Sequence, residues 1–114
     1  MVTPSVGAVI LVSFPFSDLS QTKLRPALVV AKAGHEDWIL YQITSNVYSD
    51  PMALEITNQD FSNGSLRNTS YARPGKILTA NRSLILSRVG ILKLESLTTI
   101  INSIVRMFQS GLVS

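Results

Sequence analysis

With 114 residues, the chain has room for one domain of ordinary size, which we expect to span residues 1–114. Hydrophobic residues make up 46% and charged residues 15%, and no cysteine is present, so disulfide frameworks, thiolate zinc sites and thiol nucleophiles are excluded. The formal net charge of +3 favours an anionic partner, although no polybasic tail is present.

The composition also bears on location and assembly. No apolar run approaches the ~20 residues of a membrane span, and the N-terminus lacks the basic region and small-residue cleavage site of a secretory signal. We therefore expect a cytoplasmic protein. The high hydrophobic content of so small a domain indicates that a second subunit covers part of the apolar surface, as in a homodimer.

The first half of the chain predicts three strands. Residues 7–14 are rich in Val, Ile and Leu without helical spacing, which is typical of a buried strand. A polar loop is expected over residues 16–25. Two apolar runs, 27–31 and 38–44, then flank the polar residues 34–37, which predicts a β-hairpin with a turn of four or five residues.

The next part of the chain predicts shorter strands. After a polar loop at 45–51, residues 52–57 alternate as in a half-buried strand, whereas residues 58–68 look irregular. Residues 69–79 are expected to form two short strands that are interrupted at 73–75, because the proline there cannot donate to a central ladder.

Three elements close the chain. Asn81 is suited to cap a short helical turn over 81–83, and residues 85–92 again have a strand pattern. Between residues 94 and 108, apolar side chains recur at spacings of three and four, which predicts an amphipathic helix. Five or six short strands with one terminal helix indicate a mainly β (α+β) fold, in which a small curled sheet or barrel packs against the helix.

The usual catalytic motifs are missing from the sequence. The single histidine, His35, falls in the expected hairpin turn, where a solvated surface residue is the ordinary outcome. No HExxH, no carboxylate triad and no glycine-rich nucleotide loop occurs, so metal hydrolysis, nucleotide hydrolysis and hydride transfer lack their usual residues. We expect neither a metal nor an organic cofactor.

Two residues beside the polar loops could bind a phosphate together. Arg25 enters one strand of the expected hairpin and Thr44 leaves the other, so both should lie at the same edge of the sheet. A guanidinium pairs with two phosphate oxygens, and a hydroxyl can donate one more hydrogen bond. A surface ion pair for Arg25 and simple strand preference for Thr44 are the alternative interpretations.

The residues around this corner resemble one known family. Residues 7–19 (GAVILVSFPFSDL) and 24–30 (LRPALVV) are similar to the N-terminal signature of the MazF/PemK toxins, and residues 42–45 (QITS) resemble their second motif. The C-terminal half of the family is matched by SYARP at 70–74, NRSLI at 81–85 and Gly90. The similarity therefore spans nearly the whole chain.

This resemblance implies a fold and an activity. Members of the family are dimeric SH3-like barrels with a C-terminal helix, and they are toxins of toxin–antitoxin pairs that cut single-stranded RNA at short sequences without a metal. By resemblance, Arg25 is the catalytic arginine and Thr44 contacts the phosphate. The RNA 2′-hydroxyl would attack the adjacent phosphorus, leaving a 2′,3′-cyclic phosphate and a 5′-hydroxyl. A cognate MazE-like antitoxin would mask the site with an acidic tail across the loops after Phe14 and Thr44.

One motif departs from the family pattern. Many members carry Gly-Ser-Glu-Gln before the arginine, with the glutamate as a candidate base, whereas this chain has SQTK at 20–23. The nearest carboxylate is Asp18, which becomes the candidate base. Ser20 and Thr22 are candidates for orienting groups, and Lys23 for electrostatic assistance to the phosphate. A solvated loop without a catalytic role fits these four residues equally well.

Other residues could extend an RNA-binding surface. Arg73 and Arg82 are candidates for contacts with flanking nucleotides. Four aromatic residues are possible stacking platforms for unpaired bases, namely Trp38, Tyr41, Tyr48 and Tyr71. Trp38 heads an apolar strand, which is more typical of a core residue, so Tyr48 in its polar loop is the favoured platform.

Two functions other than RNA cleavage stay open. One is a CcdB-like toxin that shares the barrel, binds a topoisomerase and cleaves nothing. The other is an inactive barrel with only an assembly role, which the missing glutamate keeps open. The pair Arg25 and Thr44 favours the nuclease, because a purely protein-binding toxin does not need a phosphate site.

Overall fold

The computed structural model describes residues 4–15, 22–46 and 51–112 of the chain. Its strands are β1 (Ala8–Pro15), β2 (Thr22–Gly34), β3 (Asp37–Thr44), β4 (Leu54–Ile56), β5 (Phe61–Gly64), β6 (Ser70–Asn81) and β7 (Ile85–Leu92). Two 3-10 turns, η1 (Asn58–Asp60) and η2 (Arg82–Leu84), precede β5 and β7, and the helix α1 (Leu94–Ser110) follows β7.

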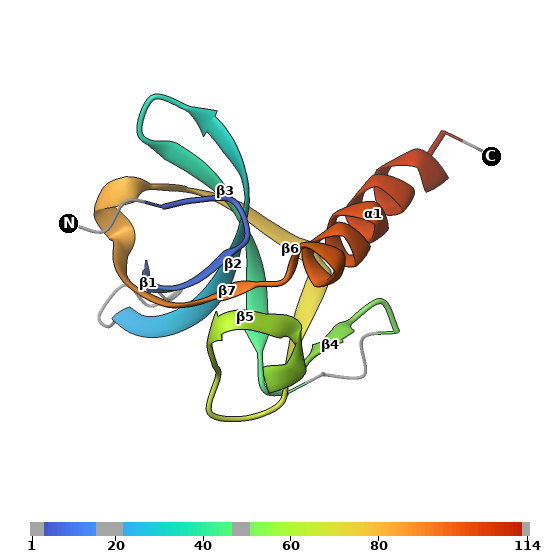
Figure 1. Cartoon of the computed structure of the whole chain (residues 1–114). Helices are drawn as coiled ribbons and strands as arrows, with labels where there is room; N and C mark the ends of the chain where they lie inside the picture. Colours follow the sequence, from blue (N-terminus) through green and yellow to red (C-terminus); the bar gives the residue numbers. More distant parts are fainter. Residues whose placement is uncertain (1–3, 16–21, 47–50, 113–114) are drawn as a thin grey trace.

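The described strands form one curled sheet with the order β4-β6-β3-β2-β1-β7-β5. Each neighbouring pair in it is antiparallel. The sheet bends into an incomplete ring, and α1 leaves it so that the C-terminal end of the helix projects beyond the strands (Figure 1). The mainly β fold with a C-terminal helix that the sequence predicted, a small SH3-like barrel, is confirmed.

The central strands are buried on both faces, which explains their continuous apolar sequence. In β1, Ala8 and Ile10 belong to one hydrophobic cluster, and Val9 between them belongs to the other. In β2, Val29 and Leu28 divide between the two clusters in the same way. Because side chains alternate across a strand, two buried faces require an apolar residue at nearly every position.

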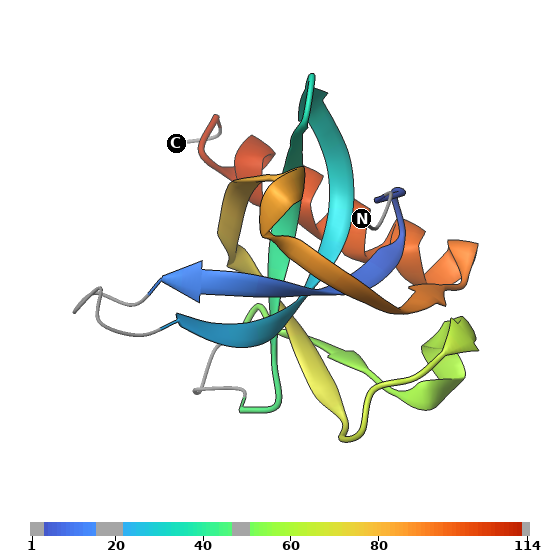
Figure 2. The same cartoon turned by 90° about the vertical axis from the view of Figure 1, so that its left-hand side faces the viewer.

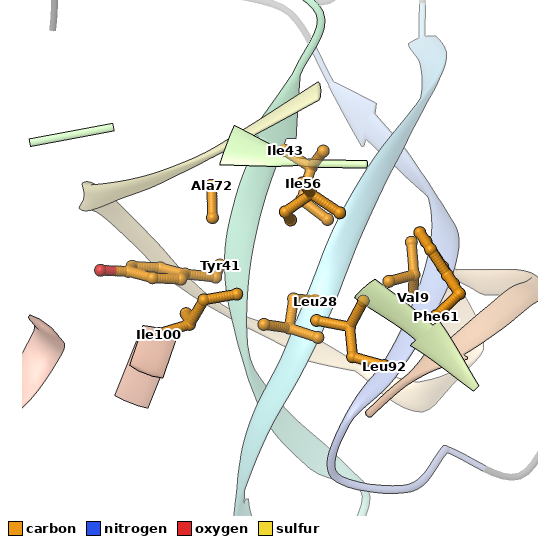
Figure 3. Close-up of a cluster of buried hydrophobic side chains, with 9 residues drawn as sticks. All are labelled: Val9, Leu28, Tyr41, Ile43, Ile56, Phe61, Ala72, Leu92 and Ile100. Atoms are coloured by element: carbon orange, nitrogen blue, oxygen red, sulfur yellow. The ribbon is translucent and has the colours of Figure 1, made fainter. Parts of the chain in front are cut away.

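The helix covers the cluster that contains Leu28, Tyr41 and Ile43 (Figure 3). Ile100 of α1 is part of this cluster and is only 4% exposed. Two threonines in the first turns have poor helix propensity, but their hydroxyls donate to the carbonyls four residues earlier, at 2.8 Å and 3.1 Å. Packing of the apolar face, rather than intrinsic propensity, therefore stabilises this helix.

Several predicted elements are confirmed. The hairpin, the strand at 85–92 and the terminal helix correspond to β2–β3, β7 and α1. Asn81 caps η2, since its side chain accepts a hydrogen bond from the Ser83 N–H at 2.9 Å. The hairpin turn is shorter than expected, because Gly34 pairs with Asp37 and only two residues connect them. His35, in this turn, is exposed and has φ 41°, as tight hairpin turns require.

The prediction of a polar loop over residues 16–25 is wrong at the C-terminal end of this range. β2 begins at Thr22, and residues 22–26 pair with residues 11–15 of β1. In Figure 2 these paired ends extend to one side of the sheet. Thr22 and Lys23 are polar, but backbone hydrogen bonds to a neighbouring strand decide whether a segment is extended, so composition alone misplaced this boundary.

Two more differences involve pairing over long distances in the sequence. Residues 61–64, expected to be irregular, form β5 against β7. The close approach depends on Gly64, whose φ is 79° and where a Cβ would collide with the Val89 carbonyl. β6 is one strand rather than two, and the expected break at 73–75 is a shift of register against β3, which falls between the partners Ala72 and Ile77.

No helix in the described part of the chain is long and apolar enough to cross a membrane.

Candidate functional site

A pocket of about 350 Å³ opens at one end of the sheet. Three segments form its wall: residues 24–26 at the start of β2, residues 43–45 at the end of β3, and residues 66–70 before and at the start of β6. The lining residues are Leu24, Arg25, Pro26, Ile43, Thr44, Ser45, Leu66, Arg67, Asn68 and Ser70. Arg25 and Thr44 thus lie on the wall of the same pocket.

The pairing of β2 with β3 explains why these two residues meet. Ala27 is paired with Gln42, and the described ladder between the strands ends there, next to Pro26, which has no N–H to donate. Continuing the same register by two residues sets Arg25 across from Thr44. The pocket opens where the ladder ends, because the two backbones are no longer joined by hydrogen bonds beyond that point.

Thr44 is held firmly at this position. Its side chain is only 7% exposed, and its backbone pairs with Tyr71 of β6. The Thr44 Oγ1 accepts a hydrogen bond from the Asn46 N–H at 3.1 Å. A threonine hydroxyl that accepts in this way still has its own proton to donate. Thr44 can therefore present one oriented donor to a ligand in the pocket.

The third segment of the wall was not expected from the sequence. Ser70, at the start of β6, is 5% exposed and donates a hydrogen bond from its hydroxyl to the Asn68 carbonyl at 3.0 Å. Leu66 packs against the hydrophobic cluster under α1. These contacts position the segment that carries Arg67. Turn-forming residues predicted a loop here, but no local signal placed it beside Arg25.

The charged side chains of the described wall are both arginines. Arg25 is half-buried and Arg67 is exposed. No Asp or Glu is among the described residues that line the pocket. Two guanidinium groups and the hydroxyl and amide donors of the same wall have the chemistry that suits an anion, and a guanidinium matches the paired oxygens of a phosphate.

Four predicted site residues lie in the segment 18–23, directly before the pocket-lining residue Leu24. Asp18 and Ser20 lie outside the described residues. Thr22 and Lys23 are described as backbone positions of β2, opposite Pro15 and Phe14 of β1. Both precede the pocket-lining residue Leu24 by one or two positions. Tyr48, the favoured stacking residue, also lies outside the described part of the chain.

The structure does not bring Arg82 to the pocket. Arg82 is in η2, where its Nε lies 3.5 Å from the Glu36 carboxylate and its N–H donates to the Glu36 carbonyl at 2.7 Å. Glu36 precedes β3, whereas Thr44 ends it, and a strand of eight residues is roughly 25 Å long. Arg73, half-buried in β6 at the register shift, is not among the lining residues either.

Two of the aromatic residues are parts of the core. Tyr41 is fully buried in the cluster of Figure 3, so the prediction that it could stack on a base is wrong. Trp38 packs against the other cluster and has the Lys32 Nζ 5.6 Å from its ring centroid. Tyr71 is half-buried opposite Thr44, next to the pocket rather than on its wall.

The fold offers no grouped metal ligands within its described residues. Among residues 4–15, 22–46 and 51–112, no three His, Asp or Glu side chains are arranged to hold a metal ion. The described residues of the pocket instead offer donors: guanidinium, hydroxyl and amide groups. The chemistry available there is therefore hydrogen bonding to an anion and stabilisation of negative charge.

Solved structures share this fold. A chain of the MazE-MazF crystal structure from Deinococcus radiodurans (Form-II) superposes with a TM-score of 0.76 at 14% identity, over 96% of this chain and 98% of that one. An endoribonuclease from Mycobacterial species gives 0.71 at 15% identity, over 96% and 94%. The Mycobacterium tuberculosis toxin MazF-mt6 gives 0.68 at 16% identity, over 90% and 96%.

Sequence comparison assigns the family. A search of curated proteins found no significant match. A family sequence model, described as PemK-like, MazF-like toxin of type II toxin-antitoxin system, matches residues 5–108. This range includes every described residue of the pocket wall. The chain therefore belongs to the PemK-like, MazF-like toxins of type II toxin–antitoxin systems.

Proposed function

We propose that this toxin is an endoribonuclease that cuts single-stranded RNA at short sequences without a metal ion. The observation that carries the proposal is the pocket in which Arg25 and Thr44 share one wall, and in which the two charged residues of the described lining are arginines. A phosphodiester is the anion that such a set of donors suits best. Two of the structural neighbours are described as an endoribonuclease and a MazF toxin, which supports the same activity.

In the proposed reaction, the RNA 2′-oxygen attacks the adjacent phosphorus and the bond from phosphorus to the 5′-oxygen breaks. The products are a 2′,3′-cyclic phosphate and a 5′-hydroxyl. Negative charge develops on the non-bridging oxygens in the transition state. Arg25 stabilises this charge with its guanidinium, and Thr44 donates a hydrogen bond from its hydroxyl to one of the same oxygens.

Two proton transfers complete the reaction. A base removes the proton of the attacking 2′-hydroxyl, and an acid protonates the departing 5′-oxygen. Asp18 is the candidate base on sequence grounds alone. Ser20 and Thr22 are the candidates for orienting groups, and Lys23 is the candidate for electrostatic assistance to the phosphate. An Asp18→Asn substitution tests this assignment, because it removes the base without changing the size of the side chain.

A direct test uses purified protein and a long single-stranded RNA in EDTA. Sequencing the ends of the products should reveal 2′,3′-cyclic phosphate and 5′-hydroxyl termini. Arg25→Ala should lower the cleavage rate at least about a hundredfold, as removal of one strong oxyanion donor does. Arg106→Ala is the matched control, because Arg106 is an exposed arginine of α1 outside the pocket.

Three results would count against the proposal. Cleavage that disappears in EDTA and returns with a divalent cation would show that the charge is stabilised by a metal. Full activity of Arg25→Ala would remove the arginine from the mechanism. Binding to a topoisomerase without any RNA cleavage would favour the CcdB-like alternative, in which the same barrel acts by binding a protein.

We further propose that the toxin is a cytoplasmic homodimer that a MazE-like antitoxin masks. Support for a covered surface comes from the C-terminal half of α1, where Val105 and Phe108 are 44% and 64% exposed. They line an apolar groove of about 240 Å³ between α1 and strands β2, β3 and β6. Exposed apolar surface of this kind is typical of an interface. Light scattering should give the dimer mass, and a monomer at micromolar concentration would contradict the proposal.

A further inference from the structure

We infer that Arg67 binds the RNA phosphate next to the one that is cut, so that the toxin recognises at least two consecutive phosphates. This inference rests on the proposed ribonuclease function. It assigns a role to a residue of the loop between β5 and β6, which forms the third segment of the pocket wall. The geometry points to this role through the position, exposure and support of Arg67.

The position of Arg67 is set by its neighbours in the chain. On one side, Leu66 is partly buried against the hydrophobic cluster that also contains Ile43 and Ile56. On the other side, the buried Ser70 hydroxyl holds the Asn68 carbonyl at 3.0 Å. The backbone is therefore anchored immediately before and after Arg67. A guanidinium on an anchored loop has less conformational entropy to lose on binding than one on an unsupported loop.

The two arginines of the wall differ in exposure, which suggests different partners. Arg25 is half-buried beside Thr44, a place suited to the phosphate that reacts. Arg67 is exposed on the same wall. A single strand of RNA carries one phosphate per nucleotide, so a phosphate held inside the pocket has its neighbours just outside it. The exposed guanidinium is placed to meet one of them.

The electrostatics of the wall favour this second contact. None of the described lining residues is acidic, so no carboxylate among them competes with RNA for Arg67. An arginine–phosphate contact of this kind carries little sequence information, and it strengthens binding in a salt-dependent way. Arg67 should therefore affect the Michaelis constant and its salt dependence more than the rate of the chemical step.

The test compares Arg67→Ala, Arg67→Lys and the wild type in EDTA between about 50 and 300 mM salt. On a long RNA, Arg67→Ala should raise KM about fivefold with nearly unchanged kcat, and it should reduce the slope of log(kcat/KM) against log salt by about 0.7, the value for one phosphate of a single strand. Arg67→Lys keeps the charge, so its KM and its salt slope should both stay close to those of the wild type. Arg106→Ala removes the same charge elsewhere and should change neither.

A second arm identifies the phosphate. It uses oligonucleotides in which one phosphate next to the cleaved one is replaced by a neutral methylphosphonate. At one position, this replacement should lower the kcat/KM of the wild type about fivefold. At the same position, it should not lower the kcat/KM of Arg67→Ala any further. A dinucleotide with a single phosphate should be cut equally by both proteins. The inference is overturned if the losses of kcat/KM from the methylphosphonate and from Arg67→Ala add at every position. It is also overturned if Arg67→Ala leaves the slope of log(kcat/KM) against log salt unchanged.

The design separates this inference from the proposed function. Binding to an RNA with a 2′-deoxy group at the cleavage position can be measured by fluorescence anisotropy, without any catalysis. If the wild type binds the 2′-deoxy RNA but does not cut the all-ribose RNA of the same sequence, the nuclease proposal fails while the contribution of Arg67 is still measured. If Arg25→Ala abolishes cleavage while Arg67→Ala binds and cuts like the wild type, the nuclease stands and the role of Arg67 is wrong.

Discussion

Replacing Thr44 by valine separates the structural role of its hydroxyl from its proposed chemical role. Valine has nearly the same shape as threonine, so the buried position stays filled, but both hydrogen bonds of the hydroxyl are lost. One of them is the bond from the Asn46 N–H to the Thr44 Oγ1 at 3.1 Å. The other is the proposed donation to a phosphate oxygen. The two losses have different sizes and different assays.

The structural cost is small. The Asn46 N–H loses an acceptor, but Asn46 is exposed, so water can replace it. We expect the free energy of unfolding to fall by no more than about 1 kcal/mol. The chemical cost is larger, because a hydrogen bond to a charged group contributes about 1.5–3 kcal/mol, which corresponds to a loss of roughly tenfold to 150-fold in kcat/KM.

Thr44→Ser is the matched control for this substitution. It keeps the hydroxyl and removes one methyl group from a side chain that is 7% exposed, which should cost about 1 kcal/mol of stability. We therefore expect both variants to lose no more than about 1 kcal/mol of stability, whereas only the valine variant loses activity and the serine variant keeps its activity within about threefold. Urea denaturation and cleavage of a labelled RNA measure the two quantities. Full activity of Thr44→Val would refute the proposed donation.

Three further predictions concern the scaffold. Gly90→Ala should lower the free energy of unfolding by about 1–3 kcal/mol, because a Cβ there would lie 2.5 Å from the Asn63 carbonyl oxygen. Gly75→Ala is the control: a Cβ at Gly75 would have no atom within 4 Å, so the free energy of unfolding should change by less than about 0.5 kcal/mol. Asp60→Ala should cost about 1–3 kcal/mol in urea denaturation, since its carboxylate accepts 2.8 Å hydrogen bonds from the Thr57 N–H and from α1. Arg82→Ala should leave RNA cleavage unchanged and shift the thermal midpoint of unfolding little. A tenfold loss of cleavage would contradict this prediction and indicate that Arg82 contacts the RNA.

Local sequence patterns determined a large part of the fold. The hairpin, β7 and α1 each carry their own signal: two apolar runs around a polar turn, a short apolar strand, and apolar residues at helical spacing. The capping role of Asn81 is similarly local, because the side chain and the N–H that it binds are two residues apart. The motifs around Arg25 and Thr44 were sufficient to predict the family that the sequence model then assigned.

Long-range pairing decided the rest. β5 exists because Phe61 pairs with Leu92 and Gly64 with Gly90, partners that lie far along the chain and leave no trace in the composition of residues 61–64. The same pairing holds β5 beside β7, and the loop after it carries Arg67 to the pocket wall. In β6, the proline that had predicted two separate strands lies where the register against β3 changes, so the strand continues through it.

The sequence by itself therefore determined the class of fold, the family and the two residues nearest the proposed chemistry, since these depend on residue type and spacing along the chain. Only the tertiary structure decided which other side chains join them. It added Arg67 and Ser70 to the pocket, held Arg82 at the opposite end of β3, and buried Tyr41 in the core. The physical reason is that a site is assembled from segments whose proximity depends on the register and curvature of the whole sheet, which no single segment specifies.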